Sequence, residues 1–431
     1  MYNTGMEERL TIAYLVRPAE GGIKSHLTTL IAGLNIDRFE PVIICPPDSG
    51  LFREAEESGY RLFPLDLSGD LNIPKDFKAV LRLKRLIRRI HPHVLHIHSI
   101  KAGLVGRLAT LMLKRKPKVL LTVHSFVFDE RTGNVKRRIV SWIERMLAKR
   151  TDGIIAVSNA LKHELVDTMG IDPDKIAVIP NGVSFLPPAE RNPRPKGRAA
   201  EPLIPYAVTK NGNLSLFPDL EPPESLADPM PDEPEEAAWT PVVGTVARLA
   251  PQKGIDHLVR AAAAVLLKYP AARFVIVGDG PLRRTLEDLA ASMGILKSFE
   301  FMGYRSDALS IIPMFDVFVL PSTRETFGLT LVEALSQEVP VVASRVGGIT
   351  EIVDGVTTGL LTQPGDADDL AEKICMLLED ETLSAQLARE GSRFVRLHFS
   401  SERMVMETEQ LYCAVTWERP GSGSQGMLFK A

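Results

Sequence analysis

The sequence predicts an α/β protein built from two Rossmann-like, doubly wound domains that face a central cleft. Short apolar runs alternate with longer amphipathic segments over residues 8–185, and the same alternation starts again at residue 241. This alternation is typical of parallel sheets that are covered by helices on both faces. A proline-rich stretch separates the two series, so each series is expected to form its own sheet.

The first domain, residues 8–185, is expected to contain seven strands. Each is a short run rich in Val, Ile and Leu, which favours a buried strand. Segments with helical spacing of apolar residues fall between most of these runs, for example 75–90 and 134–150. The expected strands are 10–16, 41–46, 61–67, 93–99, 118–125, 153–158 and 175–182.

The second domain, residues 241–400, repeats the pattern with six expected strands. Each is followed by a loop or a helix, and the helix LTLVEAL is expected to begin near Gly328. The expected strands are 241–249, 273–280, 299–303, 317–322, 339–344 and 359–364.

The stretch between the domains, residues 186–240, differs from both in composition. It is rich in proline, and residues 211–240 hold eight acids and no base. Such a segment buries too little apolar surface to offset the entropy lost on ordering. It is expected to be a disordered insertion in the linker, and residues 418–431 are expected to be a flexible tail.

The composition of the 431 residues is that of a globular protein, with 45% hydrophobic and 24% charged residues. The three cysteines lie far apart, at positions 45, 375 and 413, so neither a disulfide framework nor a cysteine metal site is expected. No apolar run is long enough to span a bilayer, and the N-terminus is too acidic for a signal peptide. A cytoplasmic location is therefore expected.

Glycines and cations follow several expected strands, where ligands bind in open α/β sheets. Gly21 and Gly22 join the first strand to a helix, Arg248 and Lys253 follow the first strand of the second domain, and Gly278 follows the next. Paired glycines at a helix N-terminus suit an anion, and two cations at a strand end suit a diphosphate. Tight turns and solvated surface cations are the alternative explanations.

Two glutamates lie in the segment STRETFGLTLVEA, residues 322–334. Glu325 is in the turn after a strand, and Glu333 is on the following helix. If that helix begins near Gly328, the two carboxylates need not touch, and the helix N-terminus between them can face a phosphate. The alternative is that a glutamate here only complements the helix dipole.

Histidines and acidic pairs are the candidate catalytic or metal-binding residues. His96, His98 and His124 end two expected strands, where a structural role and a role as donor or acceptor are both open. Two Asp-x-Asp patterns, 172–174 and 366–368, lie at a proline turn and at a helix start. Neither follows a strand at the cleft, so no metal site is expected.

Taken together, these motifs resemble those of retaining glycosyltransferases of family 4, which have the GT-B fold. The segment 322–334, with seven residues between its glutamates, is similar to that family's signature. ARLAPQKG, VGDGP, the Gly-Gly loop, AVSNALK, IPNGV and GGITEIV are similar to further segments of the family, in its order. The resemblance covers nearly everything except 186–240 and the two ends.

The resemblance implies a role for each matching residue. Glu325 would contact the donor sugar, Glu333 would hold the ribose hydroxyls, and His124 would approach the sugar from the first domain. Arg248 and Lys253 would neutralise the diphosphate. The implied donor-binding residues are Gly21, Gly22, Gly278, Met302 (beside the nucleotide base), Phe327, Gly328, Leu329 and Glu333. The loop 347–353 would complete the donor pocket, and residues 401–417 would pack back across the hinge.

The implied activity is the transfer of a sugar from a nucleotide-diphosphate sugar to an acceptor, with retention of configuration and without a metal or other cofactor. By analogy with the family, the product would be a cell-surface polysaccharide or glycolipid. Residues 75–150 hold 20 Lys or Arg and four acids, and 75–90 interleaves apolar and basic residues as interfacial helices do. A lipid-linked or membrane-proximal acceptor and a peripheral site on the inner face of the plasma membrane are therefore hypotheses. A solvated outer helix is the alternative.

Other functions fit the sequence less well. Nucleotide-sugar epimerases share the GT-B architecture, and a non-catalytic nucleotide-sugar-binding protein would share the donor residues. A nicotinamide dehydrogenase is disfavoured because no GxGxxG follows the first strand of either domain. Nucleic acid is not an expected partner because aromatic residues are sparse among the basic ones.

Overall fold

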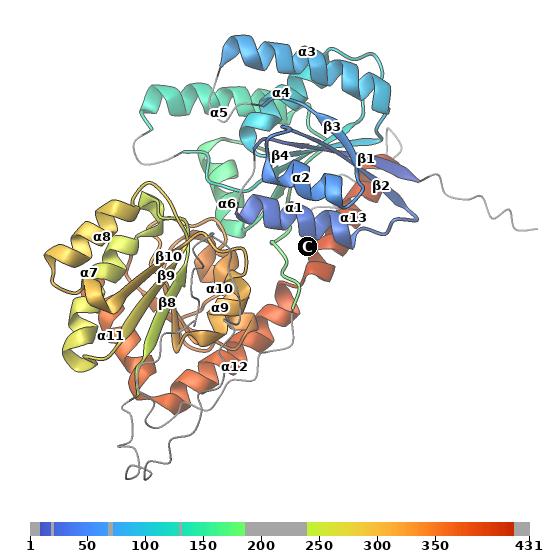
Figure 1. Ribbon diagram of the computed structural model, residues 1–431. Coiled ribbons are helices and arrows are strands. Elements are labelled where there is room, and N and C mark those ends of the chain that lie inside the picture. The colour runs from blue at the N-terminus through green and yellow to red at the C-terminus, as the bar shows by residue number, and fades with distance from the viewer. Residues whose placement is uncertain (1–8, 19–20, 68–71, 129–131, 186–238, 418–431) are drawn as a thin grey trace, which may run out of the picture.

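The computed structural model describes residues 9–18, 21–67, 72–128, 132–185 and 239–417, which form two domains (Figure 1). Nearly all of the predicted insertion and the whole predicted tail lie outside the described residues. The predictions of disorder for these two segments therefore stay predictions.

The first domain holds a parallel sheet that contains all seven predicted strands. The strands are β1 (Leu10–Val16), β2 (Phe39–Cys45), β3 (Arg61–Pro64), β4 (Val94–His98), β5 (Lys118–Val123), β6 (Gly153–Ala156) and β7 (Ile176–Val178). Their order in space is β3-β2-β1-β4-β5-β6-β7. The order reverses between β1 and β4, and ligands bind beside such a switch point in doubly wound sheets.

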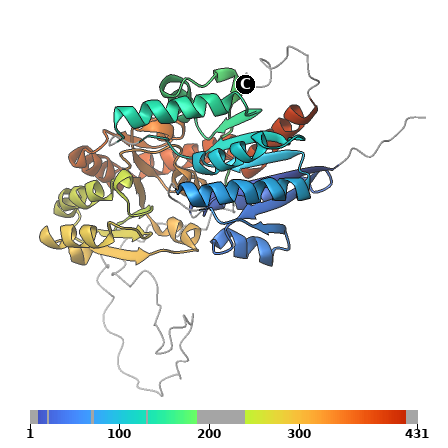
Figure 2. The same ribbon diagram turned by 90° about the horizontal axis from the view of Figure 1, so that it is seen from above.

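Helices cover both faces of this sheet. They are α1 (Gly22–Gly33), α2 (Gly50–Glu57), α3 (Ile73–Ile90), α4 (Ile100–Leu111), α5 (Asn134–Ala148) and α6 (Asn159–His163). Side chains of a strand alternate between faces. Ala13 and Leu15 of β1 accordingly share a core with α3 and α4, whereas Ile12 and Tyr14 share one with α1 and α2. Figure 2 views the layer of α3 to α5 from above, coloured blue to teal.

The helix predicted at 75–90 is present as α3, and local signals define its ends. The Asn72 side chain accepts a hydrogen bond from Lys75 N, and His91 ends the helix in the left-handed conformation. Most of the apolar residues that suggested an interfacial helix face the core instead, although Phe77 is 61% exposed. The buried residues of α3 are Ala79, Val80, Leu83, Ile87 and Ile90. An outer helix of an α/β layer has this same one-sided pattern, so the periodicity alone could not separate the two roles.

The second domain holds a parallel sheet with all six predicted strands. They are β8 (Val242–Val246), β9 (Arg273–Val277), β10 (Phe299–Gly303), β11 (Val317–Leu320), β12 (Val341–Ser344) and β13 (Leu360–Thr362). Their order is β10-β9-β8-β11-β12-β13, which again reverses beside the first strand. The helices are α7 (Ile255–Lys268), α8 (Arg283–Ser292), α9 (Ala308–Ile311), α10 (Leu329–Ser336), α11 (Ala367–Glu379), α12 (Glu381–His398) and α13 (Ser401–Trp417).

The last two helices return the chain to the first domain. Val183 N donates to Phe399 O at 2.9 Å, and Ser401 N donates to Val183 O at 3.0 Å, where α12 gives way to α13. Helix α13 then packs on α1, and the Tyr412 hydroxyl lies 2.9 Å from that of Tyr14 in the core. Residues 401–417, which were predicted to pack back across the hinge, form α13, and this helix lies against the first domain (Figure 1).

Candidate active site

The predicted site residues lie where strands of the two sheets end. His124 directly follows β5, Arg248 lies two residues beyond β8, Gly278 directly follows β9 and Glu325 lies five residues beyond β11. Since all strands of each sheet are parallel, these loops gather at one edge of each sheet. This is the edge at which doubly wound sheets bind ligands.

Lys253 and Glu325 form an ion pair between the Nζ and Oε2 atoms. The Glu325 carboxylate also lies 3.5 Å from the Ser322 hydroxyl. Both charged side chains are partly exposed, 23% for Lys253 and 12% for Glu325. The cation and the carboxylate predicted to meet the diphosphate and the sugar are therefore adjacent and open to solvent.

Helix α10 begins next to this pair. Gly328 adopts φ +101°, which only glycine tolerates well, and lets the chain turn sharply from the loop into the helix. No side chain caps the N-terminus of this helix, so its first N–H groups stay available for an anion. The prediction that the helix begins near Gly328 is confirmed.

Glu333 lies one turn inside α10 and does not pair with Glu325, whose carboxylate is held by Lys253. Its side chain is half-buried. Burial raises the pKa of the Glu333 carboxyl from 4.5 to about 7. None of the described residues forms an ion pair with Glu333. A partly desolvated carboxylate gains from hydroxyl donors, which its predicted ribose partner would supply.

Two glycines after β12 hold the Glu325 loop, residues 321–328 between β11 and α10, in place. Gly348 N donates to Glu325 O at 3.1 Å. A Cβ atom on Gly347 would lie 2.1 Å from Glu325 O, and one on Gly348 would lie 2.2 Å from Thr326 O. Only glycine fits at both positions, so the loop 347–353 supports the Glu325 loop through close backbone contact.

The remaining predicted donor residues occupy the surrounding loops. Gly278 (φ +132°) leaves no room for a Cβ atom beside Ala247 O, and Met302 is half-buried at the end of β10. Phe327 is buried against Phe399, with ring centroids 5.3 Å apart. Leu329 is the half-buried first residue of α10, and the Arg248 side chain is exposed.

The Gly21–Gly22 turn opens helix α1 at the edge of the first sheet. Both glycines are exposed, and a Cβ atom at either position would meet no described atom within 4 Å. Gly21 has φ +60° and no side chain caps the helix. The backbone N–H groups there are therefore accessible to a ligand, in keeping with the predicted role.

Side chains link the two domains directly around this site. The Thr326 hydroxyl donates to His124 O at 2.9 Å, which places the end of β5 against the Glu325 loop. Arg324 pairs with Glu164 at 3.3 Å and lies over the Phe126 ring at 4.5 Å.

The N-terminus of α6 makes a further link between the domains. The Glu351 carboxylate accepts hydrogen bonds from Asn159 N at 3.0 Å and Ala160 N at 2.9 Å. An acidic group of one domain therefore caps a helix of the other.

Three further histidines lie together behind His124. His96 is fully bonded, to the Tyr412 and Thr122 hydroxyls at 2.7 Å each. His98 Nδ1 lies 3.0 Å from His124 Nε2, and the His26 ring packs edge-on against the His124 ring. Burial lowers the pKa of His26 to about 4 and that of His96 to about 3, and burial with the neighbouring charges lowers those of His98 and His124.

Comparison with protein families assigns both halves of the chain. Residues 20–185 match the family model described as Glycosyltransferase Family 4, and residues 230–394 match that described as Glycosyl transferases group 1. The chain is a family 4 glycosyltransferase. The resemblance predicted from the motifs, and the GT-B fold, are confirmed.

Similar proteins agree with this assignment of the glycosyltransferase. An Escherichia coli UDP-Gal:alpha-D-GlcNAc-diphosphoundecaprenol alpha-1,3-galactosyltransferase is 28% identical over 81% of this chain and 82% of its own. The capsular polysaccharide biosynthesis glycosyltransferase CapM of Staphylococcus aureus is 25% identical over 83% and 86%. The structure of Anabaena HepE in complex with UDP and glucose has a TM-score of 0.72 at 20% identity and covers 94% of this chain and 99% of its own.

Three features of this glycosyltransferase were not predicted from its sequence. They are the Lys253–Glu325 pair, the capping of α6 by Glu351, and the position of His26 beside His98 and His124. Glu351 and Asn159 are 192 residues apart, so no local pattern could have joined them. His26 follows the Gly-Gly turn by one helical turn, and this spacing was the only available signal.

Proposed function

We propose that this glycosyltransferase is a retaining, metal-independent enzyme that transfers a sugar from a UDP-sugar to a lipid-linked acceptor. The product would belong to a cell-surface polysaccharide or glycolipid. The names of the similar proteins support the proposal, because one names a UDP-Gal donor with a diphosphoundecaprenol acceptor and another names capsular polysaccharide. The Anabaena HepE structure in complex with UDP and glucose supports the choice of base.

The observation that carries the proposal is the Lys253–Glu325 pair at the uncapped N-terminus of α10. When the donor binds, its diphosphate takes over Lys253 and the helix N–H groups as partners. The bond between the anomeric carbon and the diphosphate oxygen breaks, and negative charge builds on that oxygen. Fixed donors at such a point are worth roughly 3–4 kcal/mol each in the transition state.

The freed Glu325 carboxylate then faces the anomeric carbon as positive charge develops there. We place the acceptor hydroxyl on the same side as the leaving diphosphate, so that the new bond forms where the old one breaks and the configuration is retained. The hydroxyl proton passes to the departing phosphate oxygen. No metal is needed, because Lys253, Arg248 and the helix N-terminus balance the negative charge of the diphosphate, which a metal ion would otherwise balance.

The acceptor side of the proposal is supported by helix α5. Four apolar side chains form a stripe at helical spacing on its exposed face: Val135, Ile139, Trp142 and Met146 are 73%, 54%, 61% and 47% exposed. The exposed residues Lys136 and Arg138 flank the stripe. An exposed apolar stripe with cations beside it suits the surface of an anionic bilayer.

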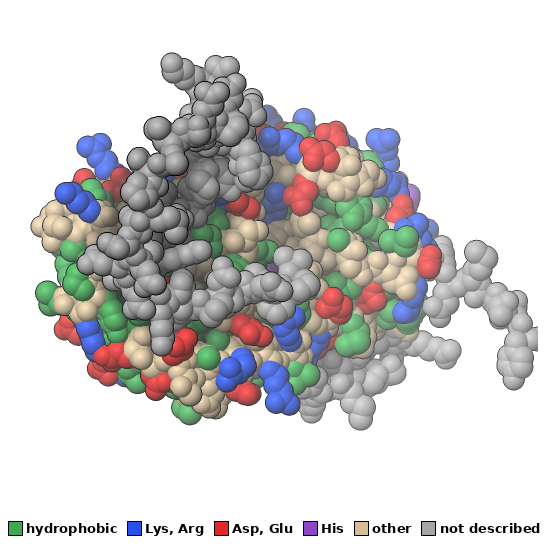
Figure 3. Space-filling view, turned by 60° about the horizontal axis from the view of Figure 1, so that its bottom comes forward, with side chains coloured by type: hydrophobic (Ala, Val, Ile, Leu, Met, Phe, Trp, Pro, Cys, Tyr) green, Lys and Arg blue, Asp and Glu red, His purple; other side chains and the backbone are tan. Residues whose placement is uncertain are grey.

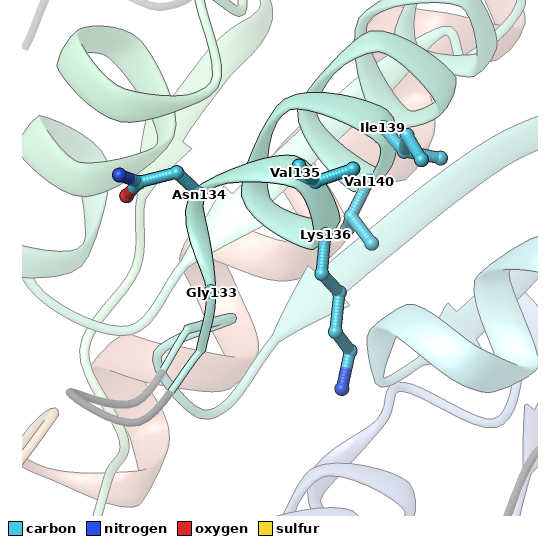
Figure 4. Close-up of a pocket in the computed structure, with 6 residues that line it drawn as sticks. All are labelled: Gly133, Asn134, Val135, Lys136, Ile139 and Val140. Carbon is cyan, nitrogen blue, oxygen red and sulfur yellow. The ribbon is translucent and has the colours of Figure 1, made fainter.

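The N-terminal end of the α5 stripe also lines a surface depression (Figure 4). Its lining residues are Gly133, Asn134, Val135, Lys136, Ile139 and Val140. Figure 3 shows basic and acidic side chains interspersed on the described part of the face that it draws. Helix α5 belongs to the first domain, which makes this domain the candidate for contact with the inner face of the plasma membrane. None of the described helices is long and apolar enough to cross a bilayer.

The first experiment measures thermal stability with UDP-, GDP- and ADP-sugars, each with and without EDTA. A donor at 100 times its dissociation constant should add about 2.7 kcal/mol of apparent stability. Stabilisation by UDP-sugars that persists in EDTA is expected. No shift with any donor at millimolar concentration would overturn the donor site, and loss of the shift in EDTA would overturn metal independence.

Product analysis separates transfer from the alternative functions. Incubation of the active donor with a polyprenyl-diphosphate sugar should give an extended lipid in which NMR finds the anomeric configuration of the donor. An inverted linkage would contradict the retaining mechanism. An epimer of the donor with no extended lipid would instead identify an epimerase.

A further inference from the structure

We propose that His26, His98 and His124 bind a single Zn²⁺ ion, and that the bound ion blocks the donor site. The side chains come from α1, from the end of β4 and from the residue after β5. One ligand atom of each lies within 4.8 Å of those of the other two. The inhibitory part rests on the proposed function and on the sugar contact that the family resemblance implies for His124.

The spacing of the three rings is close to that of a zinc site. Three nitrogens bound to Zn²⁺ at about 2.0–2.1 Å lie about 3.3 Å apart in a tetrahedron. His98 Nδ1 and His124 Nε2 are already 3.0 Å apart. The widest pair needs to close by no more than about 1.5 Å, which side-chain rotation can supply. The ion would replace the hydrogen bond between His98 and His124.

Unsatisfied nitrogens at this place need a partner. Neither His26 Nδ1 nor His26 Nε2 has a hydrogen bond within the described part of the chain, and His98 Nε2 also has none there. Both rings are almost fully buried, with 3% exposure for His26 and 0% for His98. A buried nitrogen without a partner costs roughly 1–3 kcal/mol. An ion would give a partner to one of the two His26 nitrogens, whereas an ion bound to His98 Nδ1 leaves His98 Nε2 as it is.

His96 shows why the site contains three histidines and not four. Its ring centroid lies 4.2 Å from that of His98. Both of its nitrogens are used, by the Tyr412 and Thr122 hydroxyls. It therefore has no lone pair to offer unless that network breaks.

The chemistry of the three side chains selects the class of ion. Burial favours the neutral imidazoles, which is the form that binds metals. Three imidazoles without a carboxylate suit Zn²⁺ and its neighbours among the first-row metals, whereas Mg²⁺ and Ca²⁺ require oxygen ligands. His124 is the half-exposed member, so the fourth position of the ion faces the junction between the domains.

The position of His124 explains how a bound ion would block the donor site. His124 O already accepts a hydrogen bond from Thr326 in the Glu325 loop. An ion held on the His124 ring would prevent the ring from contacting a sugar. This histidine site is separate from the two Asp-x-Asp patterns, 172–174 and 366–368. A metal ion bound here would inhibit sugar transfer and would not assist it.

The test uses the full-length, metal-stripped protein with its accessible thiols alkylated, so that cysteines cannot bind the ion. One equivalent of Co²⁺, a spectroscopic substitute for Zn²⁺, should give the intense visible bands of a four-coordinate ion. Zn²⁺ should displace it, and Mg²⁺ should not. Zn²⁺ should also raise the apparent KM for the donor at least about tenfold without lowering kcat, as expected of competition.

Two variants and a matched control locate the ion. His26→Asn should weaken Zn²⁺ binding by more than about 100-fold, because even groups that only orient metal ligands are worth about 10- to 100-fold. His124→Asn should weaken it likewise, and being half-exposed it tests the site even if the buried change disturbs folding. His163→Gln, an exposed histidine on α6, should leave the Co²⁺ spectrum unchanged.

The experiments distinguish failure of the metal site from failure of the proposed transferase function. A six-coordinate spectrum, no binding, or binding unchanged in both His26→Asn and His124→Asn would overturn the metal site. Tight binding with no change in KM would overturn its inhibitory role. Absence of donor binding in the metal-free protein would count against the proposed function alone, because the Co²⁺ spectrum does not depend on the donor.

Discussion

The Lys253–Glu325 pair shows how two site residues can be prepared for a ligand before it arrives. Each carries a charge that would otherwise be solvated, and each holds the other in place. The sequence predicted both residues but assigned them to different parts of the donor. Their contact depends on β8 and β11 being neighbours in the sheet, and periodicity along the chain does not reveal which strands are neighbours.

Replacing Lys253 should damage catalysis far more than folding. We expect Lys253→Met to lower kcat/KM roughly 10²–10³-fold, because a fixed cation at the leaving diphosphate is lost. The melting temperature should change little, since a partly exposed pair contributes about 0–1 kcal/mol. Steady-state kinetics and thermal unfolding measure both effects. Lys268→Met, which breaks the surface pair of Lys268 with Glu379, is the matched control and should leave kcat/KM unchanged.

Glu333 should make the stability of the free enzyme depend on pH. Its folded-state pKa of about 7 lies above its ordinary value of 4.5, so between these values the folded state retains a proton that the unfolded state releases. The free energy of unfolding therefore falls as pH rises through this window, and the loss is complete above pH 7. Glu333→Gln should be more stable than the wild type at pH 8, by on the order of 2 kcal/mol, and equal to it below pH 4.5.

Urea unfolding at several pH values measures this effect. Glu372→Gln, whose side chain is 67% exposed, should show no such dependence. The gain in stability should coincide with weaker donor binding at pH 8, because a charged acceptor for the ribose hydroxyls is lost. A constant difference between Glu333→Gln and the wild type across the pH range would contradict the assignment.

At the scale of single elements, the sequence predicted the positions of the strands, because these depend on local patterns of apolar residues. All thirteen expected strands are present, because buried parallel strands are short apolar runs bounded by turns. The direction that a helix faces was harder to predict. Helices 75–90 and 134–150 both mix apolar and basic residues. Helix α3 turns most of its apolar residues inward, Phe77 excepted, whereas α5 exposes Trp142 and Ile139. Only the packing of α3 on α4 and the sheet decides between these cases.

The exposed stripe of α5 should bind anionic membranes. We expect Ile139→Gln and Trp142→Gln each to weaken binding to phosphatidylglycerol vesicles about tenfold or more, because burying such a side chain contributes roughly 1.5–3 kcal/mol. Vesicle flotation at low salt measures the effect, and binding should decrease as salt increases. Leu267→Gln on α7, where the leucine is 87% exposed, is the matched control. Wild-type binding in both α5 variants would exclude α5 as the contact.

At the scale of the whole molecule, side-chain contacts around the site join the two domains in their observed arrangement. Glu351 caps α6 of the other domain, and Arg324 joins Glu164 and Phe126. These contacts lie beside the Glu325 loop. The linkage therefore connects the arrangement of the domains to the state of the donor site, as in hinge-type closure.

Loosening these contacts should open the molecule and leave each domain intact. We expect the double variant Arg324→Met, Glu351→Gln to lose on the order of 2 kcal/mol of interdomain interaction. The donor-free radius of gyration in small-angle X-ray scattering should rise, and saturating UDP-sugar should restore it. KM should increase more than kcat falls, because donor binding must now supply the energy of closure.

A matched control separates closure from general stability. Arg273→Met breaks the Arg273–Glu300 pair, which joins β9 and β10 within the second domain at 2.7 Å. This change removes a partly exposed pair worth about 0–1 kcal/mol, and it should leave both the radius of gyration and KM unchanged. If the double variant scatters like the wild type without donor, the contacts of Arg324 and Glu351 do not set the domain arrangement. Closure would then depend on the backbone pairing of Val183 with Phe399 and Ser401.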